Sequence, residues 1–565
     1  MARPVSVAGV VLAACGLLVG CAELPTSGPV VAGNPVRQQQ EPPYVSVKPQ
    51  GPVAEADQVD VVDGYLNAMS SYEPGYDTAR MFLTPDAAAA WDPAAGITVH
   101  DDAGASVDLI AGGAVRVSFD VSGTVGADGS YSASAAPTPG QLTLDMEQVE
   151  GEWRIANPAP GIVVSDYHFD REFEAHNLYF FDPGFDVLVP DPIYLPVRGQ
   201  TTTILAQALL RGPSSWLAPG VRSAFPDGTE LAVSSVPVES GTAIVELSAE
   251  ASDAGPEQRE QMAAQLAWTL GDLPQVDQVA VNSDGIPLPP DSQAVSLRDV
   301  AEYDPAVLRP DSFLYGVGAT GVVALGDEGQ PEPVAGPFGA MPDVREVAVN
   351  PGGNRAAVVD ATGREVRIAT FGENEPVETV VTGSDLASLS WDRNGLIWLL
   401  DRAAPDPGLI VLRPGGEPVV ARAGGLAGHD VERLAVSLDG TRVALVMDGA
   451  AYVGVVIRES DTADEVRVDN LRRIGPDRVA TDIVWTAPDR VAVLLRGDGA
   501  APEAHVLLMS GVDEISDGPV REAVGLAGAP LHDLVVGTSD NRVLAQQDAA
   551  LWVEIGQLGA PAYPG

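Results

Sequence analysis

Cys21 is the residue of this chain whose surroundings point most directly to a particular chemistry. It follows Leu18, Val19 and Gly20, at the end of a run from Val5 that holds no charged residue. The small side chain of Gly20 leaves the peptide bond before Cys21 accessible to a signal peptidase, and the new N-terminal cysteine can carry a diacylglycerol on its sulfur. We therefore predict signal cleavage between Gly20 and Cys21 and lipidation at Cys21.

The apolar run before Cys21 is shorter than the roughly 20 residues that a membrane span requires. It fits the hydrophobic region of a signal peptide, with Arg3 as a weak positive flank. The pattern resembles the lipobox of bacterial lipoproteins, and the alternative is a general secretory signal in which Cys21 is incidental. Two acyl chains, at roughly 0.8 kcal/mol per buried CH2, would hold the protein permanently on the extracytoplasmic face of the cell membrane.

Cysteine chemistry elsewhere in the chain is not expected. Cys15 is the only other cysteine, and it lies inside the segment to be removed. The mature chain therefore offers no disulfide and no second thiol as a nucleophile.

Other patterns that suggest chemistry are weaker. Gly316–Gly321 matches GxGxxG, but a dinucleotide site needs a helix directly afterwards. The apolar residues Val322–Leu325 favour a strand there, so we predict a hairpin turn. A GxSxG nucleophile motif is missing, and 79 acidic residues produce neighbouring pairs by chance. We therefore predict no enzyme, with no catalytic, cofactor-binding or metal-binding residue.

The histidines also give no metal-binding pattern. Metal sites in proteins combine closely spaced histidine and cysteine ligands, and no such spacing occurs here. We expect surface or locally hydrogen-bonded histidines instead. The six are His100, His168, His176, His429, His505 and His532.

The net charge of the chain limits the kinds of molecule that it can bind. Acidic residues outnumber basic ones 79 to 32, which gives a formal net charge of -47. Nucleic acid is excluded as a partner, because that affinity comes from neutralising phosphates with basic side chains. The same charge disfavours anionic lipid headgroups. A solvated surface is the expectation, and an acidic face for a basic partner is the alternative.

Composition and hydrophobic pattern divide the chain into five segments. The predicted segments are a signal peptide (1–20), a lipidated N-terminus and flexible linker (21–55), an α+β domain (56–175), a second α+β domain (177–298) and an all-β domain (310–565).

The first α+β domain starts with helices and ends in strands. Val59 to Met69 has helical spacing, a second helical stretch covers Thr78–Trp91, and from Val115 apolar and polar residues alternate. Helices followed by an antiparallel sheet make an α+β domain, in an order similar to an NTF2-like cone.

The second α+β domain mixes short strands with two helices. The first helix is expected to be capped by Thr202 or Thr203 and the second by Ser252 or Asp253. The expected strands are Val187–Val189 and Ile193–Leu195, split by Pro190-Asp191-Pro192, then Leu231–Val238, Ala243–Leu247 and Val276–Val281.

The third domain contains a repeat of two apolar strands around an Asp/Asn/Gly turn. Five units are visible, and positions 349, 391, 436, 485 and 536 are taken as equivalent. Hairpins repeating about every 40–50 residues are typical of a β-propeller. Phe313–Tyr315 and Val322–Leu325 supply part of another blade or close the ring with the C-terminal strands, so the count is five or six. Trp391, Trp398 and Trp485 are expected to fill the core between blades; lining a ligand site at the propeller mouth is the alternative.

The sequence resembles the LpqB family of actinobacterial lipoproteins, with a second domain similar to a GerMN domain. The resemblance rests on the lipobox, the three-domain order and these segments: Leu24–Pro29, Leu210–Pro213, Phe225–Thr229, Ala243–Ser248 and Ala264–Leu270.

This resemblance implies a regulatory role. LpqB-like proteins are associated with the MtrAB two-component system, where they act on the extracellular part of the sensor kinase MtrB and influence cell division and cell-wall homeostasis. The family offers no catalytic residue to carry over. Two other functions stay open: binding of a cell-envelope glycan or peptide through the propeller, and, in third place, a propeller hydrolase.

Overall fold

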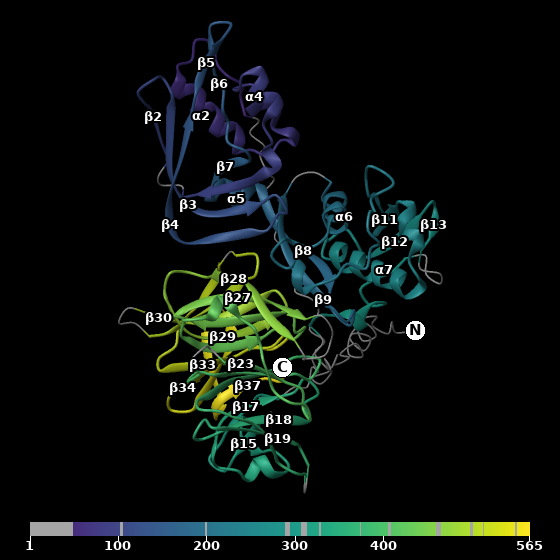
Figure 1. The fold of residues 1–565 in the computed structure, drawn as a ribbon, viewed down its shortest axis with the longest axis vertical. Coiled ribbons are helices and arrows are strands. Elements are labelled where there is room, and N and C mark those ends of the chain that lie inside the picture. The colour runs from purple at the N-terminus through teal and green to yellow at the C-terminus, as the bar shows by residue number, and fades with distance from the viewer. Residues whose placement is uncertain are drawn as a thin grey trace, which may run out of the picture. The chain divides into compact units, whose positions relative to one another are not determined.

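A computed structural model describes most of the chain after residue 48. It describes residues 49–101, 105–197, 200–288, 294–306, 313–326, 329–372, 375–404, 408–458, 465–497, 501–511, 513–548 and 551–565. Gly20 and Cys21 lie outside these residues. Pro49–Gly565 forms one compact unit (Figure 1). Within the described residues, no helix combines the length and apolarity needed to cross a bilayer.

The first part packs helices against a five-stranded sheet. The helices are α2 (Gln58–Met69), η1 (Pro74–Tyr76), α3 (Asp77–Arg80), α4 (Pro85–Ala90), η2 (Pro93–Ala95) and α5 (Asp166–Glu172). The strands are β1 (Gly96–His100), β2 (Ser106–Leu109), β3 (Val115–Gly126), β4 (Tyr131–Leu144), β5 (Met146–Val149), β6 (Glu152–Ile155) and β7 (Ile162–Ser165). The sheet runs β2-β3-β1-β7, with β4 also paired to β3 and β5-β6 as a separate hairpin.

The expected helix over Thr78–Trp91 is broken into two. α3 ends at Arg80 and α4 begins after Thr84, whose hydroxyl accepts the N–H of Ala87, with Pro85 at the first helical position. Proline at that position has no N–H to lose and starts a helix readily, but it cannot continue one. Phe82 and Leu83 in the break are buried, as expected.

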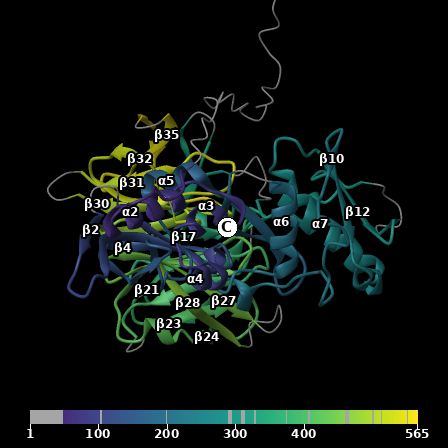
Figure 2. The ribbon, with the colours of Figure 1, turned by 90° about the horizontal axis from the view of Figure 1, so that it is seen from above.

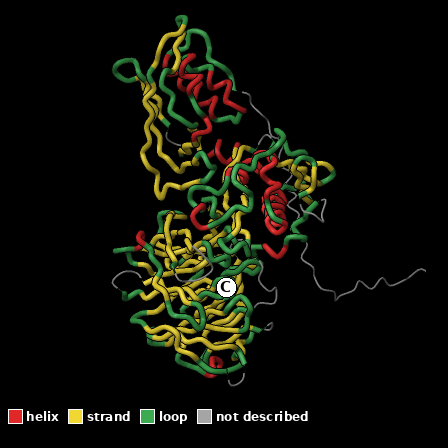
Figure 3. The backbone as a smooth tube through the Cα atoms, turned by 45° about the vertical axis from the view of Figure 1, so that its right-hand side comes forward, coloured by secondary structure: helices red, strands yellow, loops and turns green. Residues whose placement is uncertain are grey.

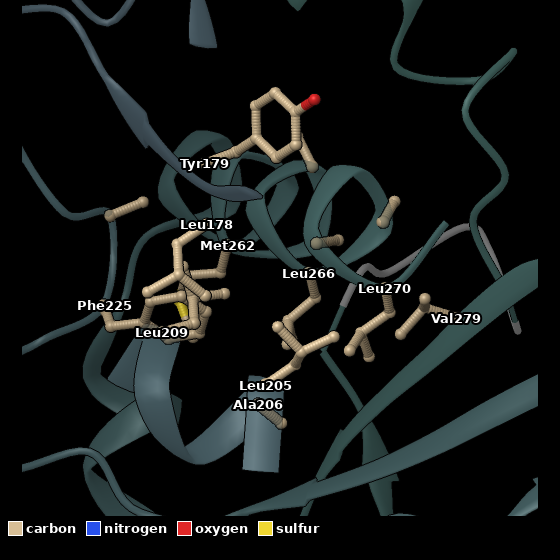
Figure 4. Close-up of a cluster of buried hydrophobic side chains, with 14 of the residues drawn as sticks. Leu178, Tyr179, Leu205, Ala206, Leu209, Phe225, Met262, Leu266, Leu270 and Val279 are labelled. Atoms are coloured by element: carbon tan, nitrogen blue, oxygen red, sulfur yellow. The ribbon is translucent and has the colours of Figure 1, made fainter. Parts of the chain in front are cut away.

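The second part holds two helices between short sheets. Its elements are β8 (Phe173–Phe181), β9 (Leu188–Pro196), α6 (Thr201–Arg211), η3 (Ala218–Gly220), β10 (Val238–Glu239), β11 (Thr242–Leu247), η4 (Ala249–Asp253), α7 (Pro256–Gly271), β12 (Gln278–Ser283), β13 (Ile286–Pro287) and η5 (Ala301–Tyr303). α6 and α7 lie side by side in both Figure 1 and Figure 2. Their apolar faces meet β8 and β12 in one core, which Figure 4 shows.

The expected division of the strand at Pro190 and Pro192 is wrong. β9 is continuous and pairs with β8 along its whole length, with Pro190 opposite Tyr179 and Pro192 opposite Asn177. Because β8 and β9 form a two-stranded sheet, both are edge strands. An edge strand has one side without ladder hydrogen bonds, so it tolerates residues that lack an N–H.

The expected helix caps and one strand of the second part are also wrong. The N-cap of α6 is Gln200, and the N-cap of α7 is Gly255, followed by Pro256. The stretch Leu231–Val238 contributes only the short strand β10 and a single bridge from Leu231. The N-cap is the residue at which the backbone changes from an extended to a helical conformation. Residue types alone did not show where this change occurs.

The third part is a set of four-stranded antiparallel sheets, almost entirely strand and loop (Figure 3). The first sheet has β14 (Tyr315–Val317), β15 (Val322–Leu325), β16 (Pro331–Pro333) and β37 (Gly559–Ala562); the second β17 (Val344–Val349), β18 (Arg355–Asp360), β19 (Glu365–Thr370) and β20 (Glu378–Thr382); the third β21 (Leu386–Trp391), β22 (Ile397–Asp401), β23 (Gly408–Leu412) and β24 (Val419–Val420).

Three further sheets complete the third part, with two single-turn helices in the loops. The fourth sheet has β25 (Val431–Val436), β26 (Arg442–Met447), β27 (Ala450–Arg458) and β28 (Val466–Ile474); the fifth β29 (Val479–Ala487), β30 (Arg490–Arg496), β31 (Glu503–Leu508) and β32 (Asp513–Pro519); the sixth β33 (Ala523–Ala527), β34 (Val535–Thr538), β35 (Arg542–Asp548) and β36 (Leu551–Gln557). The helices are η6 (Pro337–Ala340) and η7 (Gly424–Leu426).

The innermost strands of these sheets form a closed ring. β17, β21, β25, β29, β33 and β37 contact one another in that order, and β37 contacts β17 again. The ring closes because β37, from the C-terminal end, pairs with β14 in the first sheet. The GxGxxG segment is the β14–β15 hairpin, with Val317 opposite Val322, as predicted.

The fifth sequence repeat was aligned one strand out of place. Positions 349, 391, 436 and 485 lie on innermost strands, but Val536 lies on β34, the second strand of its sheet. The innermost strand there is β33, which a longer loop separates from β34. Apolar hairpins with an Asp/Asn/Gly turn occur between any two neighbouring strands of such a sheet, so the pattern alone could not distinguish them.

Three consecutive residues after α6 tie the three parts together, and we call Ser214–Trp216 the joint segment. Ser214 donates from its N–H and its hydroxyl to Asp191 of β9, at 2.6 and 2.8 Å. Ser215 donates in the same way to Asp128 of the first part, at 2.9 and 2.8 Å. Trp216 Nε1 donates to the carbonyl of Asn470 on β28, at 2.7 Å.

Candidate functional site

A cavity lies in the channel that the ring of innermost strands encloses. It measures about 570 Å³. At the end where these strands begin, it is lined by charged and hydroxyl-bearing residues, which we call the channel mouth: Arg345, Glu346, Ser388, Arg402, Arg433 and Asp482. At the end where these strands finish, it is lined by Tyr563, Pro564 and Gly565, and the carbonyl of Val349 accepts the N–H of Gly565 at 3.0 Å.

Two partly buried carboxylates of the mouth connect neighbouring sheets. Glu346 on β17 accepts the N–H groups of Ser388 (3.1 Å) and Leu389 (2.5 Å) on β21. Asp482 on β29 accepts the N–H of Leu526 on β33 at 2.7 Å and lies 3.3 Å from Arg433 Nε on β25. Burial raises the pKa of Glu346 and of Asp482, although these hydrogen bonds and the Arg433 charge oppose the shift.

These acids lie on different sheets of the ring and accept hydrogen bonds from backbone groups. Glu346 belongs to the second sheet and Asp482 to the fifth, so two sheets separate them around the ring. General acid–base chemistry needs both groups within reach of one substrate bond. Their oxygens are instead engaged by backbone N–H groups of the next sheet.

An ion-pair network covers the rest of the mouth. Asp385 accepts from Arg345 at 3.3 Å and lies 2.8 Å from Arg402 Nη2. Hydrogen bonds and charge from Arg402 and Arg345 hold the pKa of Asp385 below its usual range. All three side chains are about one third exposed, with values of 34%, 36% and 30% for Arg345, Asp385 and Arg402. They therefore offer charged, directional groups to a polar ligand at the channel entrance.

Ser388 is the residue of the mouth whose conformation calls for an explanation. Its φ is 58°, in the left-handed region that non-glycine residues rarely adopt. The pairing of β21 with β22 shifts register between Ala387 and Ser390, so Ser388 lies in a β-bulge. Its side chain is 7% exposed, and its hydroxyl is buried with no hydrogen-bond partner among the described residues. Strain and an unsatisfied polar atom at one cavity-lining residue are typical of a ligand contact.

The three tryptophans lie where the sequence favoured them, between sheets. Trp391 Nε1 donates to the carbonyl of Ala348 in the preceding sheet at 3.1 Å, and Trp485 Nε1 donates to that of Ala435 at 3.0 Å. Trp398 is fully buried and donates to Asp392 Oδ2 at 3.1 Å. The interpretation as core between blades is confirmed for all three, although Trp485 also borders the channel.

Five of the six histidines have local polar partners, whereas His532 Nε2 is buried without a hydrogen-bond partner among the described residues. His100 contacts the Asp101 carbonyl and His168 the Ser165 hydroxyl, each at 2.9 Å. His429 pairs with Asp448 at 2.5 Å, His176 lies 3.9 Å from Glu174, and His505 lies 3.4 Å from Glu503. His532 stacks on Tyr563, and burial lowers its pKa. Among the residues described, no group of three potential metal ligands gathers.

Sequence reasoning missed Ser388, Glu346 and Asp482. Their roles depend on a β-bulge and on bonds to the next sheet, and neither leaves a spacing pattern. A weak signal exists for the acids, because each is the acidic residue of an inner strand that is mostly apolar.

Comparison with known families matches three consecutive segments. Residues 51–170 match the "Lipoprotein LpqB, N-terminal domain", residues 177–289 match "Sporulation and spore germination", and residues 321–564 match the "Lipoprotein LpqB beta-propeller domain".

Similar proteins cover the chain from end to end. Lipoprotein LpqB of Streptomyces coelicolor is 32% identical over 100% of this chain and 98% of its own. Lipoprotein LpqB of Thermobifida fusca is 30% identical over 97% of each. The first GerMN domain of GerM from Bacillus subtilis aligns with 22% of this chain and 99% of its own length, at 26% identity and a TM-score of 0.19. The chain therefore belongs to the LpqB lipoprotein family, with its N-terminal domain, a GerMN domain and a C-terminal β-propeller.

Proposed function

We propose that this protein is a membrane-anchored extracytoplasmic lipoprotein that modulates a two-component sensor kinase of the MtrAB type. Through the kinase it would influence cell-envelope homeostasis and cell division. The observation that carries the proposal is family membership over the whole chain. The kinase as partner is what the resemblance to LpqB implies.

Anchoring through Cys21 is part of the proposal. The residues around Cys21 have the lipobox pattern, and the segment 21–55 is rich in proline, glycine and glutamine. The lipid confines the protein to the membrane surface, where its effective concentration near a membrane kinase is high.

A binding role is favoured over chemistry by the state of the channel acids. Glu346 and Asp482 are committed to backbone N–H groups of adjacent sheets. A hydrolase would need such carboxylates free to exchange protons with a substrate. We therefore propose that the protein is not an enzyme.

We also propose the number of propeller blades, the fold of the N-terminal domain and the domain limits. The six sheets are taken as six blades, because their innermost strands follow one another around a closed ring. The helices and curved sheet of the first part support an NTF2-like assignment. The domain limits 56–175, 177–298 and 310–565 are proposed with them.

The test is crosslinking at the surface of living cells. A photoreactive group is placed at exposed positions of each domain in turn, and the captured protein is identified. Capture of the sensor kinase supports the proposal. Phosphorylation of the response regulator should also change when the gene is deleted and return when it is restored. If neither the capture nor this change occurs, the proposal fails.

A second candidate, binding of a cell-wall glycan or peptide in the channel, is favoured by one observation. Ser388 presents a buried hydroxyl without a partner in the described structure, beside the guanidinium groups of the mouth. Soluble peptidoglycan fragments should then bind the purified protein, and Ser388→Ala should weaken binding about fivefold, the worth of roughly 1 kcal/mol. The exposed Ser384→Ala is the matched control. Equal affinity of both variants would remove this candidate.

A further inference from the structure

A second cavity lies where the N-terminal domain meets β9 and α6 of the GerMN domain. It measures about 330 Å³. Four aromatic rings line it, from Tyr72, Tyr76, Phe173 and Tyr194. Tyr72 meets Tyr76 edge-on, with ring centroids 6.0 Å apart, and meets Phe173 in the same way at 6.4 Å. Aliphatic side chains complete the walls: Ile97, Val125, Ile162 and Leu195.

Tyr76 carries two unfavourable features at once. Its φ and ψ are 51° and 46°, the left-handed region, which is an outlier for a bulky side chain. It is 5% exposed, and its hydroxyl is buried without a hydrogen-bond partner in the described part of the chain. Both features are energetically unfavourable in a folded protein. Of the described residues, only Tyr76 and Ser388 combine them, and each lines one of these two cavities.

Hydrogen bonds on both sides of Tyr76 hold the turn in which it lies. Arg80 Nε donates to the carbonyl of Gly75 at 2.9 Å, and the N–H of Thr78 donates to Glu73 at 3.1 Å. Trp91 packs against the Tyr76 ring, with centroids 6.2 Å apart. Burial raises the pKa of Tyr76, so the phenol stays protonated and is a hydrogen-bond donor.

The polar residues that line the cavity indicate the charge of an occupant. Asp128 is already engaged by Ser130 and Ser215, and these hydrogen bonds outweigh the effect of burial and lower its pKa. Arg211, the last residue of α6, is exposed and has no ion pair or hydrogen bond among the described residues. Arg211 is therefore the lining group left to meet a charge, and that charge is negative.

We propose that this cavity binds a small anionic amphiphile. Its apolar or aromatic body lies among the four rings, an uncharged acceptor oxygen receives the hydrogen bond of Tyr76, and its anionic group meets Arg211. The volume is near the lower limit of known ligand pockets, about 300 Å³, so a small molecule fits and a whole membrane lipid does not. Because the walls come from two domains, the ligand also holds the N-terminal domain against the GerMN domain.

The test uses three fluorescent naphthalene compounds and the purified full-length protein. 6-Methoxy-2-naphthoate carries both the acceptor oxygen and the charge, 2-naphthoate lacks the acceptor, and 2-methoxynaphthalene lacks the charge. The first should bind most tightly. Arg211→Gln should weaken it about tenfold without changing the affinity of 2-methoxynaphthalene. Tyr76→Phe should weaken it about fivefold without changing the affinity of 2-naphthoate.

Two control variants and a melting measurement make the test decisive. Arg116→Gln and Tyr167→Phe remove an exposed guanidinium and an exposed hydroxyl away from the cavity and should leave every affinity unchanged. Tyr76→Phe should melt no lower than wild type, because it removes an unsatisfied polar atom. Absence of binding by 6-methoxy-2-naphthoate, equal losses in the control variants, or a lower melting temperature for Tyr76→Phe overturns the proposal.

Discussion

At the scale of single residues, Asp191 shows most clearly how burial changes a side chain's properties. It is 1% exposed on β9, and desolvation raises its pKa to about 6, although hydrogen bonds from Ser214 and the charge of Arg472 oppose the shift. Asp128 adds a smaller upward contribution. The folded protein therefore holds a proton here that an unfolded aspartic acid, with a pKa of about 3.9, releases.

The sign of the pH dependence follows from that difference. Between about pH 4 and pH 6 the folded state binds more protons, so its stability falls as pH rises through this window. At 1.36 kcal/mol per pKa unit, the contribution is on the order of 3 kcal/mol. Asp191→Asn keeps an acceptor for the N–H of Ser214 and no longer titrates.

We therefore expect Asp191→Asn to flatten the pH dependence of stability. In urea unfolding at pH 4.5 and pH 7.5, the variant should lose about 2 kcal/mol less than wild type over this interval. The exposed Asp108→Asn on β2 serves as the control and should follow wild type. Parallel pH profiles for wild type and Asp191→Asn would show that Asp191 does not hold this proton.

The prediction for Cys21 concerns the anchor. Replacing Cys21 by Ala removes the sulfur that would carry the lipid, so a labelled fatty acid should no longer enter the protein. Cys15→Ala, within the predicted signal peptide, should leave the labelling intact. Undiminished labelling of Cys21→Ala would show that the protein is not a lipoprotein of this type.

Residue-level prediction from sequence worked where the type of side chain decides and failed where backbone geometry decides. Trp391 and Trp485 pack between sheets because large apolar rings at inward strand positions have no better place. Tyr76 and Ser388 were not found, because their φ angles near +50° come from a turn and a bulge. Neither residue type favours such an angle, so composition gave no signal.

At the scale of elements, the closure of the ring depends on β37. This strand is the innermost of the first sheet and pairs with β14, with Tyr315 opposite Ala562 and Val317 opposite Gly559. Without β37, β14 loses the strand with which it pairs on its inner side, and β17 and β33 lose their neighbour in the ring. A closed ring leaves no innermost strand exposed, whereas an open ring exposes two edges.

Deleting residues 559–565 should therefore destabilise the whole propeller. We expect a melting temperature lower by 10 °C or more, the order of several kcal/mol in a domain of this size, or failure to fold. Deleting only Pro564 and Gly565 keeps β37 and should cost much less. An unchanged, equally cooperative transition in the longer deletion would indicate an open array.

The approximate positions of strands and helices were predicted more accurately than the residues at which they begin and end. The repeat of apolar hairpins predicted the all-β architecture, because a long series of short apolar strands joined by tight turns is compatible with few other folds. The order of strands within the sixth sheet and the continuity of β9 through Pro190 depend on which neighbours pair. Pairing across tens or hundreds of residues is not visible in a single sequence.

At the scale of the whole molecule, the joint segment connects domains that we predicted from the sequence as separate units. Trp216 packs against the apolar cores of both the GerMN domain and the propeller. The guanidinium of Arg472 lies 4.5 Å from its ring centroid and donates to the carbonyl of Tyr131 in the N-terminal domain. The Trp216 side chain thus contacts the propeller directly, and it also packs against Arg472, which is hydrogen-bonded to the N-terminal domain.

Trp216→Ala should uncouple the domains. In calorimetry we expect the transition of wild type to separate into two, with a loss of about 2–4 kcal/mol for a large, partly buried ring. Trp153→Ala removes a partly buried tryptophan within the N-terminal domain and should lower stability without this separation. A single unchanged transition in Trp216→Ala would mean that the domains are coupled elsewhere.

The proposed function requires that the protein binds a membrane sensor kinase. The most direct measurement is the affinity of the protein, purified with its membrane and reconstituted in a lipid bilayer, for the extracellular domain of the MtrB-type kinase. We expect saturable binding, together with a change in kinase autophosphorylation when both proteins share one membrane. No binding and no change in phosphorylation, with turnover of a cell-wall glycan or peptide by the same preparation, would contradict it.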